Sequence, residues 1–210
     1  MQVDRWTGDI DIDVANRDHA LAGVRHVTAS LHNRTGRLDR HNTGVYFHNV
    51  PQDPVTGLCS VPYKQAEQQG FFKIDILNVH VYEKVRNEAH LVELMNAEFD
   101  WDLLEHPEFV GMLIHLHNQA ELVAQLKPRS IPQLAMTLAL IRPGKTHLIN
   151  KCIQQGFHSI ADEIWQQTDD KFAFKESHSY GYAMLVKVHA QIIIEELHTS
   201  GKNARCSDTA

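Results

Sequence analysis

Three aspartates near the start of the chain, Asp9, Asp11 and Asp13, alternate with branched apolar residues. Side chains on a strand point alternately to opposite faces, so we expect the carboxylates on one face and the apolar side chains, Ile12 among them, buried on the other. Carboxylates roughly 7 Å apart repel one another unless a cation lies between them. The run therefore predicts a site for a divalent cation such as Mg²⁺, which prefers oxygen ligands. The alternative is an exposed edge strand whose acidic face is merely solvated.

A second apolar run, residues 71–77, carries Lys73 and Asp75 two positions apart and therefore on one face of a strand. Burying such a pair without a further partner is costly. If the two runs are neighbouring strands, Asp75 joins Asp11 and Asp13 around a common point, where Lys73 meets an anion. Two-metal phosphoryl-transfer sites require this kind of carboxylate grouping. The alternative is an ion pair between Lys73 and Asp75 on the surface.

The composition limits the classes of protein that this chain represents. With 210 residues, 43% of them hydrophobic and 22% charged, it is long enough for one domain, or for a domain with a helical appendage. Apolar runs stay well below the roughly 20 residues of a membrane span, and we expect no signal peptide, no membrane partner and a cytoplasmic location. The net charge of −6 predicts weak binding of nucleic acid unless a partner supplies basic surface.

Cysteine and histidine do not indicate a site of their own. Cys59, Cys152 and Cys206 are widely spaced and form no C-x-x-C pair, so we expect reduced thiols instead of a disulfide framework or a zinc site. The 15 histidines are scattered, and we expect most of them at the surface or hydrogen-bonded in the core.

The elements that must position these residues follow from the spacing of apolar side chains. After the acidic strand, apolar residues between positions 20 and 31 recur at close to a helical period, with Asn16 or Asp18 as the N-cap. A short strand is predicted at residues 45–47, and a short helix at residues 64–69 that Gly70 ends.

The rest of the chain is predicted to be helical. Residues 83–95 have the pattern of an amphipathic helix, and residues 183–197 that of a mostly buried one. Prolines divide the helices of the middle section. Residues 198–210 are polar and predict a frayed tail.

Five segments of the chain resemble, in the same order, the palm and fingers of the family C bacterial replicative DNA polymerases, the alpha subunit of DNA polymerase III. They cover most of the sequence between residue 8 and about residue 197. The segments are Asp9-Ile-Asp-Ile-Asp-Val with Asn16-Arg17-Asp18; His41-Asn-Thr-Gly-Val45; Gly70-Phe-Phe-Lys73-Ile-Asp75-Ile-Leu77; Leu126-Lys-Pro128 with Leu138-Ala-Leu-Ile-Arg142-Pro-Gly144; and Phe174-Lys-Glu-Ser-His-Ser-Tyr-Gly-Tyr-Ala183.

The resemblance implies that Asp11, Asp13 and Asp75 are the catalytic residues that bind Mg²⁺ or Mn²⁺, and that Lys73 contacts primer or phosphate. It also implies that four residues of the later segments lie near nucleotide or DNA: Arg142, Lys175, Ser177 and His178. Because the three carboxylates repel one another without metal, replacing Asp75 with asparagine is expected to raise the stability of the metal-free protein slightly.

The fold implied by the resemblance is α+β: a small nucleotidyltransferase-like (polymerase beta-like) palm sheet over residues 1–88, a helical fingers-like region over 89–197 and a polar tail over 198–210. The chain departs from the family pattern at its start. The family carries a Gly-Ser triphosphate-binding motif before the acidic strand, and this motif is absent ahead of Gly8. We therefore expect a second protein chain to supply that part.

The resulting hypothesis is a reduced or split DNA polymerase III alpha-like protein. It would bind DNA and deoxynucleoside triphosphates and transfer nucleotides to a DNA primer during replication, as a DNA-directed DNA polymerase that works with a partner chain. The alternative is a non-catalytic polymerase remnant that acts as a DNA-binding or regulatory protein. The acidic net charge and the missing motif favour the remnant, whereas the acidic triad favours the enzyme. A third possibility is an unrelated helical protein.

Overall fold

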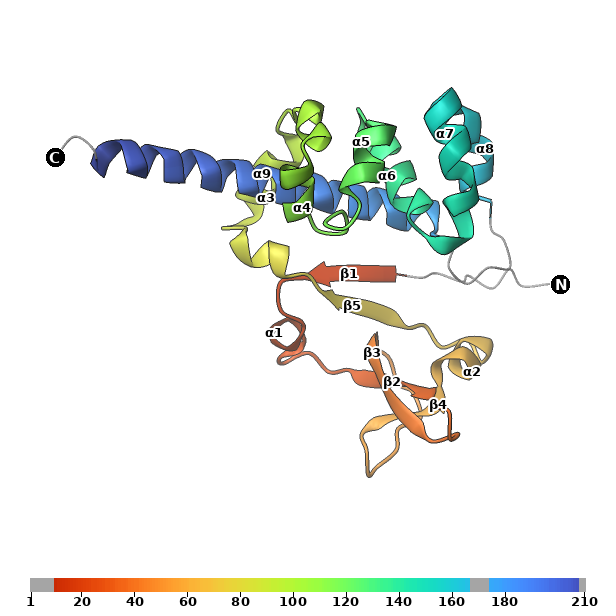
Figure 1. Cartoon of the computed structure of the whole chain (residues 1–210). Helices are drawn as coiled ribbons and strands as arrows, with labels where there is room; N and C mark the ends of the chain where they lie inside the picture. Colours follow the sequence, from red (N-terminus) through yellow and green to blue (C-terminus); the bar gives the residue numbers. More distant parts are fainter. Residues whose placement is uncertain (1–9, 167–173, 208–210) are drawn as a thin grey trace. The chain divides into compact units, whose positions relative to one another are not determined.

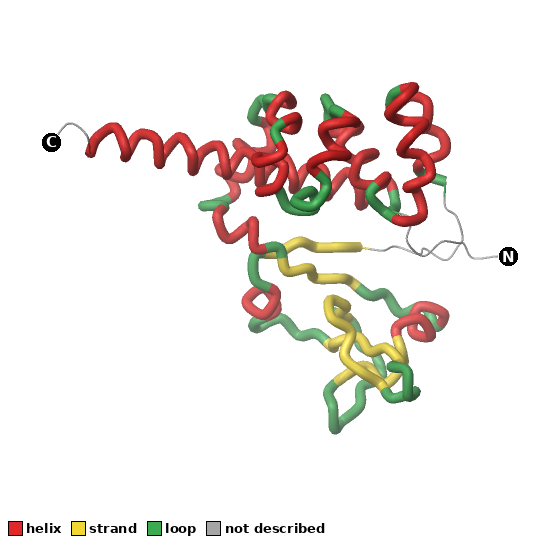
Figure 2. The backbone as a smooth tube through the Cα atoms, viewed as in Figure 1, coloured by secondary structure: helices red, strands yellow, loops and turns green. Residues whose placement is uncertain are grey.

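A computed structural model of the protein describes the backbone of residues 10–166 and 174–207, and side chains as far as residue 200. Asp9 lies outside the described residues. The chain divides into two compact units, Met1–Val85 and Arg86–Ala210, and each is considered by itself. The strands described in the structure belong to the first unit, and the second unit is helical (Figure 2).

The first unit is built on a five-stranded mixed sheet with strand order β1-β5-β3-β2-β4. Figure 1 shows β1 and β5 side by side. The β1–β5 and β2–β4 pairs are parallel, and the β2–β3 and β3–β5 pairs are antiparallel. The strands are β1 (Ile10–Val14), β2 (Val27–His32), β3 (Leu38–Tyr46), β4 (Leu58–Pro62) and β5 (Ile74–Asn78). The fold is therefore α+β, as the sequence predicts.

Three short helical segments accompany these strands: α1 (Arg17–Leu21) between β1 and β2, α2 (Tyr63–Gln68) between β4 and β5, and the 3-10 helix η1 (His80–Lys84) after β5. Asn16 is the N-cap of α1, because its side-chain oxygen accepts a hydrogen bond from His19 N at 2.9 Å, which confirms one of the two predicted caps. The predicted helix before Gly70 is confirmed as α2, and Gly70 adopts the positive φ of 88° that favours glycine.

The sheet separates two small clusters of buried apolar side chains. Adjacent residues on β3 point to opposite faces, so Val45 packs with Leu21 and Ile76 in one cluster. Tyr46 packs in the other cluster with Ala29, Cys59 and Ala66. Ile12 is an exception to the predicted burial of the apolar face of β1, because it is 42% exposed.

The predicted helix over residues 20–31 is wrong. Helix α1 ends at Leu21, Gly23 follows with a φ of 76°, and the chain re-enters the sheet as β2. Strand β2 pairs with β3 on one side and with β4 on the other, and these backbone hydrogen bonds override the weak helical periodicity. The predicted strand at residues 45–47 is only the end of β3, which begins at Leu38 because a turn at residues 33–36 pairs it with β2.

The second unit consists of short helices and one long helix. Three of the prolines begin helices, in the first turn of α4, α6 and η3, where a proline loses no helical hydrogen bond. The elements are α3 (Glu88–Asn96), η2 (Trp101–Glu105), α4 (Pro107–Met112), α5 (Ala120–Leu126), α6 (Ile131–Leu140), η3 (Pro143–Leu148), α7 (Ile149–Gln155), η4 (Phe157–Ile160), α8 (Ala161–Ile164) and α9 (Glu176–Ser207).

Two helix boundaries differ from the prediction. The amphipathic helix predicted at residues 83–95 begins only at Glu88, because Asn87 caps it with its side chain and Val85 before it is extended. The helix predicted at residues 183–197 is the middle of the 32-residue helix α9. The predicted frayed tail is therefore wrong as far as Ser207. None of the helices in the described ranges is long and apolar enough to cross a membrane.

Candidate active site

Strands β1 and β5 place the predicted aspartates together. The two strands are parallel neighbours with Asp11 directly opposite Asp75, which confirms that the two runs are adjacent strands of one sheet. Side chains of directly opposite residues project from the same face of a sheet, and Asp13 shares that face because it lies two residues after Asp11. The sheet register therefore puts all three carboxylates on one face.

Both carboxylate oxygens of Asp75 have partners among the neighbouring side chains. The Thr43 hydroxyl donates a hydrogen bond to Oδ1 at 2.7 Å, and the Lys73 ammonium pairs with Oδ2. The Lys73 side chain is only 7% exposed and that of Asp75 15%. The pair is therefore largely buried, unlike the surface pair considered as the alternative, and each charge depends on the other.

Gly44 makes room for Lys73. It lies opposite Asp75 on β3, and a Cβ atom at this position would approach Lys73 Cδ to 2.6 Å and His41 Nδ1 to 3.0 Å. The absence of a side chain lets the aliphatic part of Lys73 cross the strand and direct its ammonium group to Asp75. The segment from His41 to Gly44 thus forms a wall of the candidate site.

His41 is neutral in this wall. Its Nδ1 accepts hydrogen bonds from Gly44 N at 2.9 Å and from Thr43 N at 3.3 Å, so the ring proton is on Nε2. Burial lowers the pKa of His41, and the positive charge of Lys73 lowers it further. The ring packs edge-on against Tyr63, with the centroids 5.1 Å apart. Sequence reasoning assigned no role to His41 or Thr43, although both belong to the second of the family-like segments.

The donor set fits a hard divalent cation. Partial desolvation raises the pKa of Asp13, and the negative charge of Asp11 raises it further, so these two carboxylates oppose each other's ionisation. Mg²⁺ commonly takes only one or two protein carboxylates and completes its shell with phosphate oxygens and water. Within the described ranges, no three His, Cys, Asp or Glu side chains are already grouped around one metal position. Asp11 and Asp13 would hold the cation, with Asp75 shared between it and Lys73.

The other predicted site residues lie in the second unit, around the start of α9. The guanidinium group of Arg142 lies 4.3 Å from the centroid of the Phe174 ring. Phe174 is followed by Lys175, and Ser177 and His178 are in the first turn of α9. The structure thus brings together the fourth and fifth family-like segments.

His115 is an unpredicted neighbour of this cluster. It has a φ of 64°, which is strained for a residue with a side chain, and its ring packs edge-on against Tyr182 at 4.5 Å. Burial lowers the pKa of His115, and the charge of Arg142 lowers it further. Both His115 Nε2 and Arg142 Nε are buried and, within the part of the chain that the structure describes, lack a hydrogen-bond partner. A strained backbone of this kind has no signal in the sequence.

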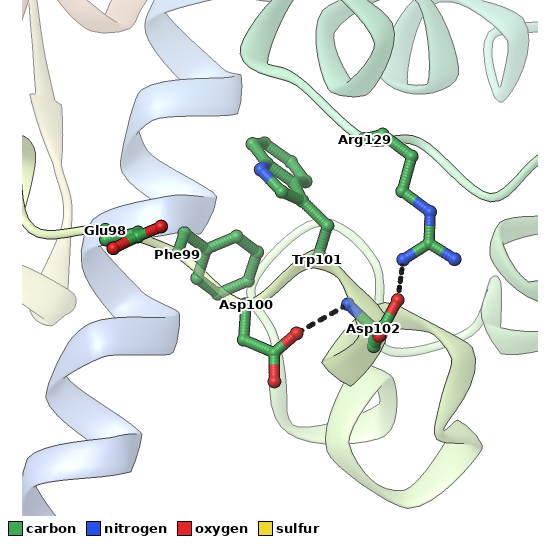
Figure 3. Close-up of a pocket in the computed structure, with 6 residues that line it drawn as sticks. All are labelled: Glu98, Phe99, Asp100, Trp101, Asp102 and Arg129. Atoms are coloured by element: carbon green, nitrogen blue, oxygen red, sulfur yellow. Dashed lines mark hydrogen bonds and ion pairs between the residues drawn. The ribbon is translucent and has the colours of Figure 1, made fainter.

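A hollow of about 600 Å³ in the second unit is lined by acidic and aromatic side chains (Figure 3). Its lining consists of Glu98, Phe99, Asp100, Trp101, Asp102 and Arg129, which include none of the predicted site residues. Figure 3 shows Arg129 directed toward Asp102, and Arg129 also pairs with Glu105. Arg129 and Asp102 thus have a structural role in the hollow, as does Asp100, which accepts a hydrogen bond from Asp102 N at 3.0 Å.

Comparison with known proteins does not identify the chain: no protein-family model matches the sequence, and no curated protein matches it. Any functional assignment therefore depends on the geometry of the site and on the five short segments.

Proposed function

We propose that the protein is a reduced, DNA polymerase III alpha-like nucleotidyltransferase that adds nucleotides to a DNA primer. The observation that supports this most is the parallel pairing of β1 with β5, which sets Asp11 opposite Asp75 with Lys73 beside it. If the acidic strand were only a solvated edge, its aspartates would not need to lie beside the Lys-x-Asp sequence of a second strand.

In the proposed reaction the 3′-hydroxyl of the primer attacks the α-phosphate of a deoxynucleoside triphosphate, and the bond to the leaving pyrophosphate breaks. Mg²⁺ or Mn²⁺ held by Asp11, Asp13 and Asp75 would supply the positive charge that stabilises the attacking and leaving oxygens. Lys73 neutralises Asp75 when the site is empty of substrate. When phosphate enters, the ammonium group turns to a phosphate oxygen and leaves Asp75 to complete the donor set.

The proposal extends to the whole chain. The sheet of the first unit acts as a nucleotidyltransferase-like palm, and the helical unit acts as fingers, with Arg142, Lys175, Ser177 and His178 toward nucleotide or DNA. A second protein chain supplies the triphosphate-binding part that corresponds to the family's Gly-Ser motif, and the protein works in the cytoplasm.

One observation favours the non-catalytic alternative. Strand β1 is at an edge of the sheet among the strands that the structure describes, and Asp11 and Asp13 are exposed there. With Asp75 already neutralised by Lys73, these two aspartates also suit a solvated edge strand. A polymerase remnant that binds DNA without turnover would keep this arrangement.

A thermal-shift titration separates the two functions. A metal that binds only the native state stabilises it by an amount that grows with the metal concentration. We expect millimolar Mn²⁺ to raise the melting temperature of the wild type, and Asp11→Asn to remove most of that rise. Asp39→Asn, an exposed aspartate on β3, is the matched control and should keep it. If Mn²⁺ has no effect on the wild type, with or without primer–template DNA, the remnant is the better description.

Primer extension then tests turnover. The isolated chain is expected to extend a primer poorly, because in this proposal a second chain supplies the triphosphate-binding part. A pull-down from the native cell followed by mass spectrometry identifies the partner chain, whose addition should restore extension. Asp11→Asn or Asp75→Asn in the restored complex should abolish extension, and extension that survives both substitutions would exclude these residues from catalysis.

A further inference from the structure

Arg17 is a buried arginine at the first position of α1. Its side chain is only 10% exposed. Its backbone N–H donates a hydrogen bond to Asn78 Oδ1 at 2.8 Å, which fixes the start of α1 to the end of β5. The side chain of Asn16, the preceding residue, caps the same helix. The position of Arg17 beside the candidate site is therefore set by two independent side-chain contacts to the backbone.

The guanidinium group of Arg17 has poor partners for a buried cation. Nη2 reaches the carbonyl oxygen of Thr43 only at 3.5 Å, and Nη1 lies 4.0 Å from the carboxylate of Asp18. Asp18 is 93% exposed, so water screens this contact. Nε is buried and has no hydrogen-bond partner among the described residues. A guanidinium group offers five donors in a planar fork, and burying it costs free energy unless carboxylate or phosphate oxygens accept them.

The surroundings of Arg17 carry more positive charge. Partial burial lowers the pKa of Arg17, and the nearby charge of Arg40 lowers it further. The charges of Lys73 and Arg17 also disfavour protonation of His41. Asp75 offsets the charge of Lys73, whereas the one carboxylate near Arg17 among the residues that the structure describes is the exposed Asp18. The positive charge of Arg17, beside the neutral wall formed by residues 41–44, therefore suits an anion.

We propose that Arg17 is a phosphate-binding residue of the candidate active site. Its guanidinium group donates hydrogen bonds to phosphate oxygens beside Thr43, the residue whose hydroxyl donates a hydrogen bond to Asp75. The choice of phosphate as the ligand rests on the proposed function. The phosphate belongs to a triphosphate or to the primer backbone, which share the same oxygen chemistry.

Stability distinguishes a binding role from a structural one. If Arg17 awaits an anion, Arg17→Met removes an uncompensated buried charge and keeps most of the side-chain volume. The substitution should then leave the melting temperature of the ligand-free protein unchanged or raise it. If Arg17 instead serves the fold, the same substitution lowers the melting temperature.

The experiment measures melting temperature for the full chain in EDTA, with pyrophosphate, dATP or a single-stranded oligonucleotide as the probe. Arg40→Met is the matched control, because it removes the same charge from a neighbouring exposed position. We expect pyrophosphate to stabilise the wild type and the control, and Arg17→Met to weaken the apparent affinity about tenfold or more, the loss of roughly 1.4 kcal/mol. Besides the pyrophosphate response, stabilisation by dATP but not by the oligonucleotide assigns the phosphate to a triphosphate, and stabilisation by the oligonucleotide but not by dATP assigns it to the primer.

Arg17→Lys is a second variant that keeps the test decisive if Arg17→Met fails to fold. It keeps the charge but loses the forked geometry, and it should fold and bind pyrophosphate more weakly than the wild type. Equal binding by the wild type and both Arg17 variants, or no stabilisation of the wild type by any probe, overturns the proposal. Because these measurements contain no metal, they are independent of the Mn²⁺ titration. A pyrophosphate response without a Mn²⁺ response would therefore contradict the polymerase function and leave the phosphate site standing.

Discussion

At the scale of single residues, the Lys73–Asp75 pair changes the expected behaviour of the metal-free protein. The sequence alone suggests three repelling carboxylates, and hence a gain in stability when one of them is removed. The structure shows that Asp75 is neutralised by a lysine that is itself buried. Removing the carboxylate would leave the Lys73 ammonium group buried without its counter-charge.

We therefore expect Asp75→Asn to lower the free energy of unfolding of the metal-free protein by about 3 kcal/mol, the cost of breaking a buried pair. Urea denaturation in EDTA measures this change. The double variant Lys73→Met, Asp75→Asn is the control, and its loss should be smaller than the sum of the two single losses. An Asp75→Asn protein as stable as the wild type would contradict a stabilising Lys73–Asp75 pair and favour simple repulsion among the three carboxylates.

Replacing Asp13 should not lower the stability of the metal-free protein, in contrast to replacing Asp75. Its pKa is raised, so the native state disfavours the charged form, and this contribution to stability decreases as the pH rises above the usual range of an aspartate. We expect Asp13→Asn to be at least as stable as the wild type at neutral pH without metal. The difference should vanish at low pH, where both side chains are neutral. Urea denaturation between roughly pH 3 and 7 measures it, and a less stable Asp13→Asn at neutral pH would contradict the assignment.

At the scale of secondary structure, the sequence predicted the elements whose signal lies within a few neighbouring residues. The cap at Asn16, the helix before Gly70 and the two strands that carry aspartates were predictable from a few neighbouring residues. Strand β2 was not, because its conformation depends on two other strands, one of which begins only at Leu58. The start of α3 was missed for a different reason: the Asn87 cap is local, but a cap leaves little trace in the periodic pattern of apolar residues.

Helix α1 is only five residues long, and its cap should matter for Arg17 as well as for the helix. We expect Asn16→Ala to lower the free energy of unfolding by about 1 kcal/mol, because the N–H group of His19 loses its acceptor. Asn16→Ser keeps an acceptor and should stay close to the wild type. Chemical denaturation checks both, and the Asn16→Ala protein should also bind pyrophosphate more weakly. Equal stability of the two variants would contradict the role of the cap.

At the scale of the whole molecule, the candidate site was predicted only where charge alternates along a strand. Asp11, Asp13, Lys73 and Asp75 met that condition. Thr43 and Arg17 belong to other elements, and only the folded sheet brings Thr43 to Asp75 and Arg17 to Thr43. His115 depends on a backbone conformation that the sequence does not encode locally. The sequence therefore did not predict site residues that reach the site from other helices and strands.

The charge of the complete chain should control its affinity for DNA. With a net charge of −6, the protein has little surplus of cations to displace counterions from phosphates. We expect the isolated chain to bind duplex DNA at physiological salt with a dissociation constant in the micromolar range or above. Fluorescence anisotropy with a labelled duplex measures it. A nanomolar constant for the isolated chain would contradict this prediction.

The parallel pairing of β1 with β5 also orders events during synthesis. Strand β1 leaves the ribosome before the strand that pairs with it, residues 74–78, which is made only after β2, β3 and β4. Closing so long a loop is slow compared with forming the hairpin of β2 and β3. The nascent chain therefore carries an unpaired strand for some time. Its aspartates keep that strand hydrated and discourage pairing with other chains until its proper neighbour arrives. The same charges thus protect the unit before it folds.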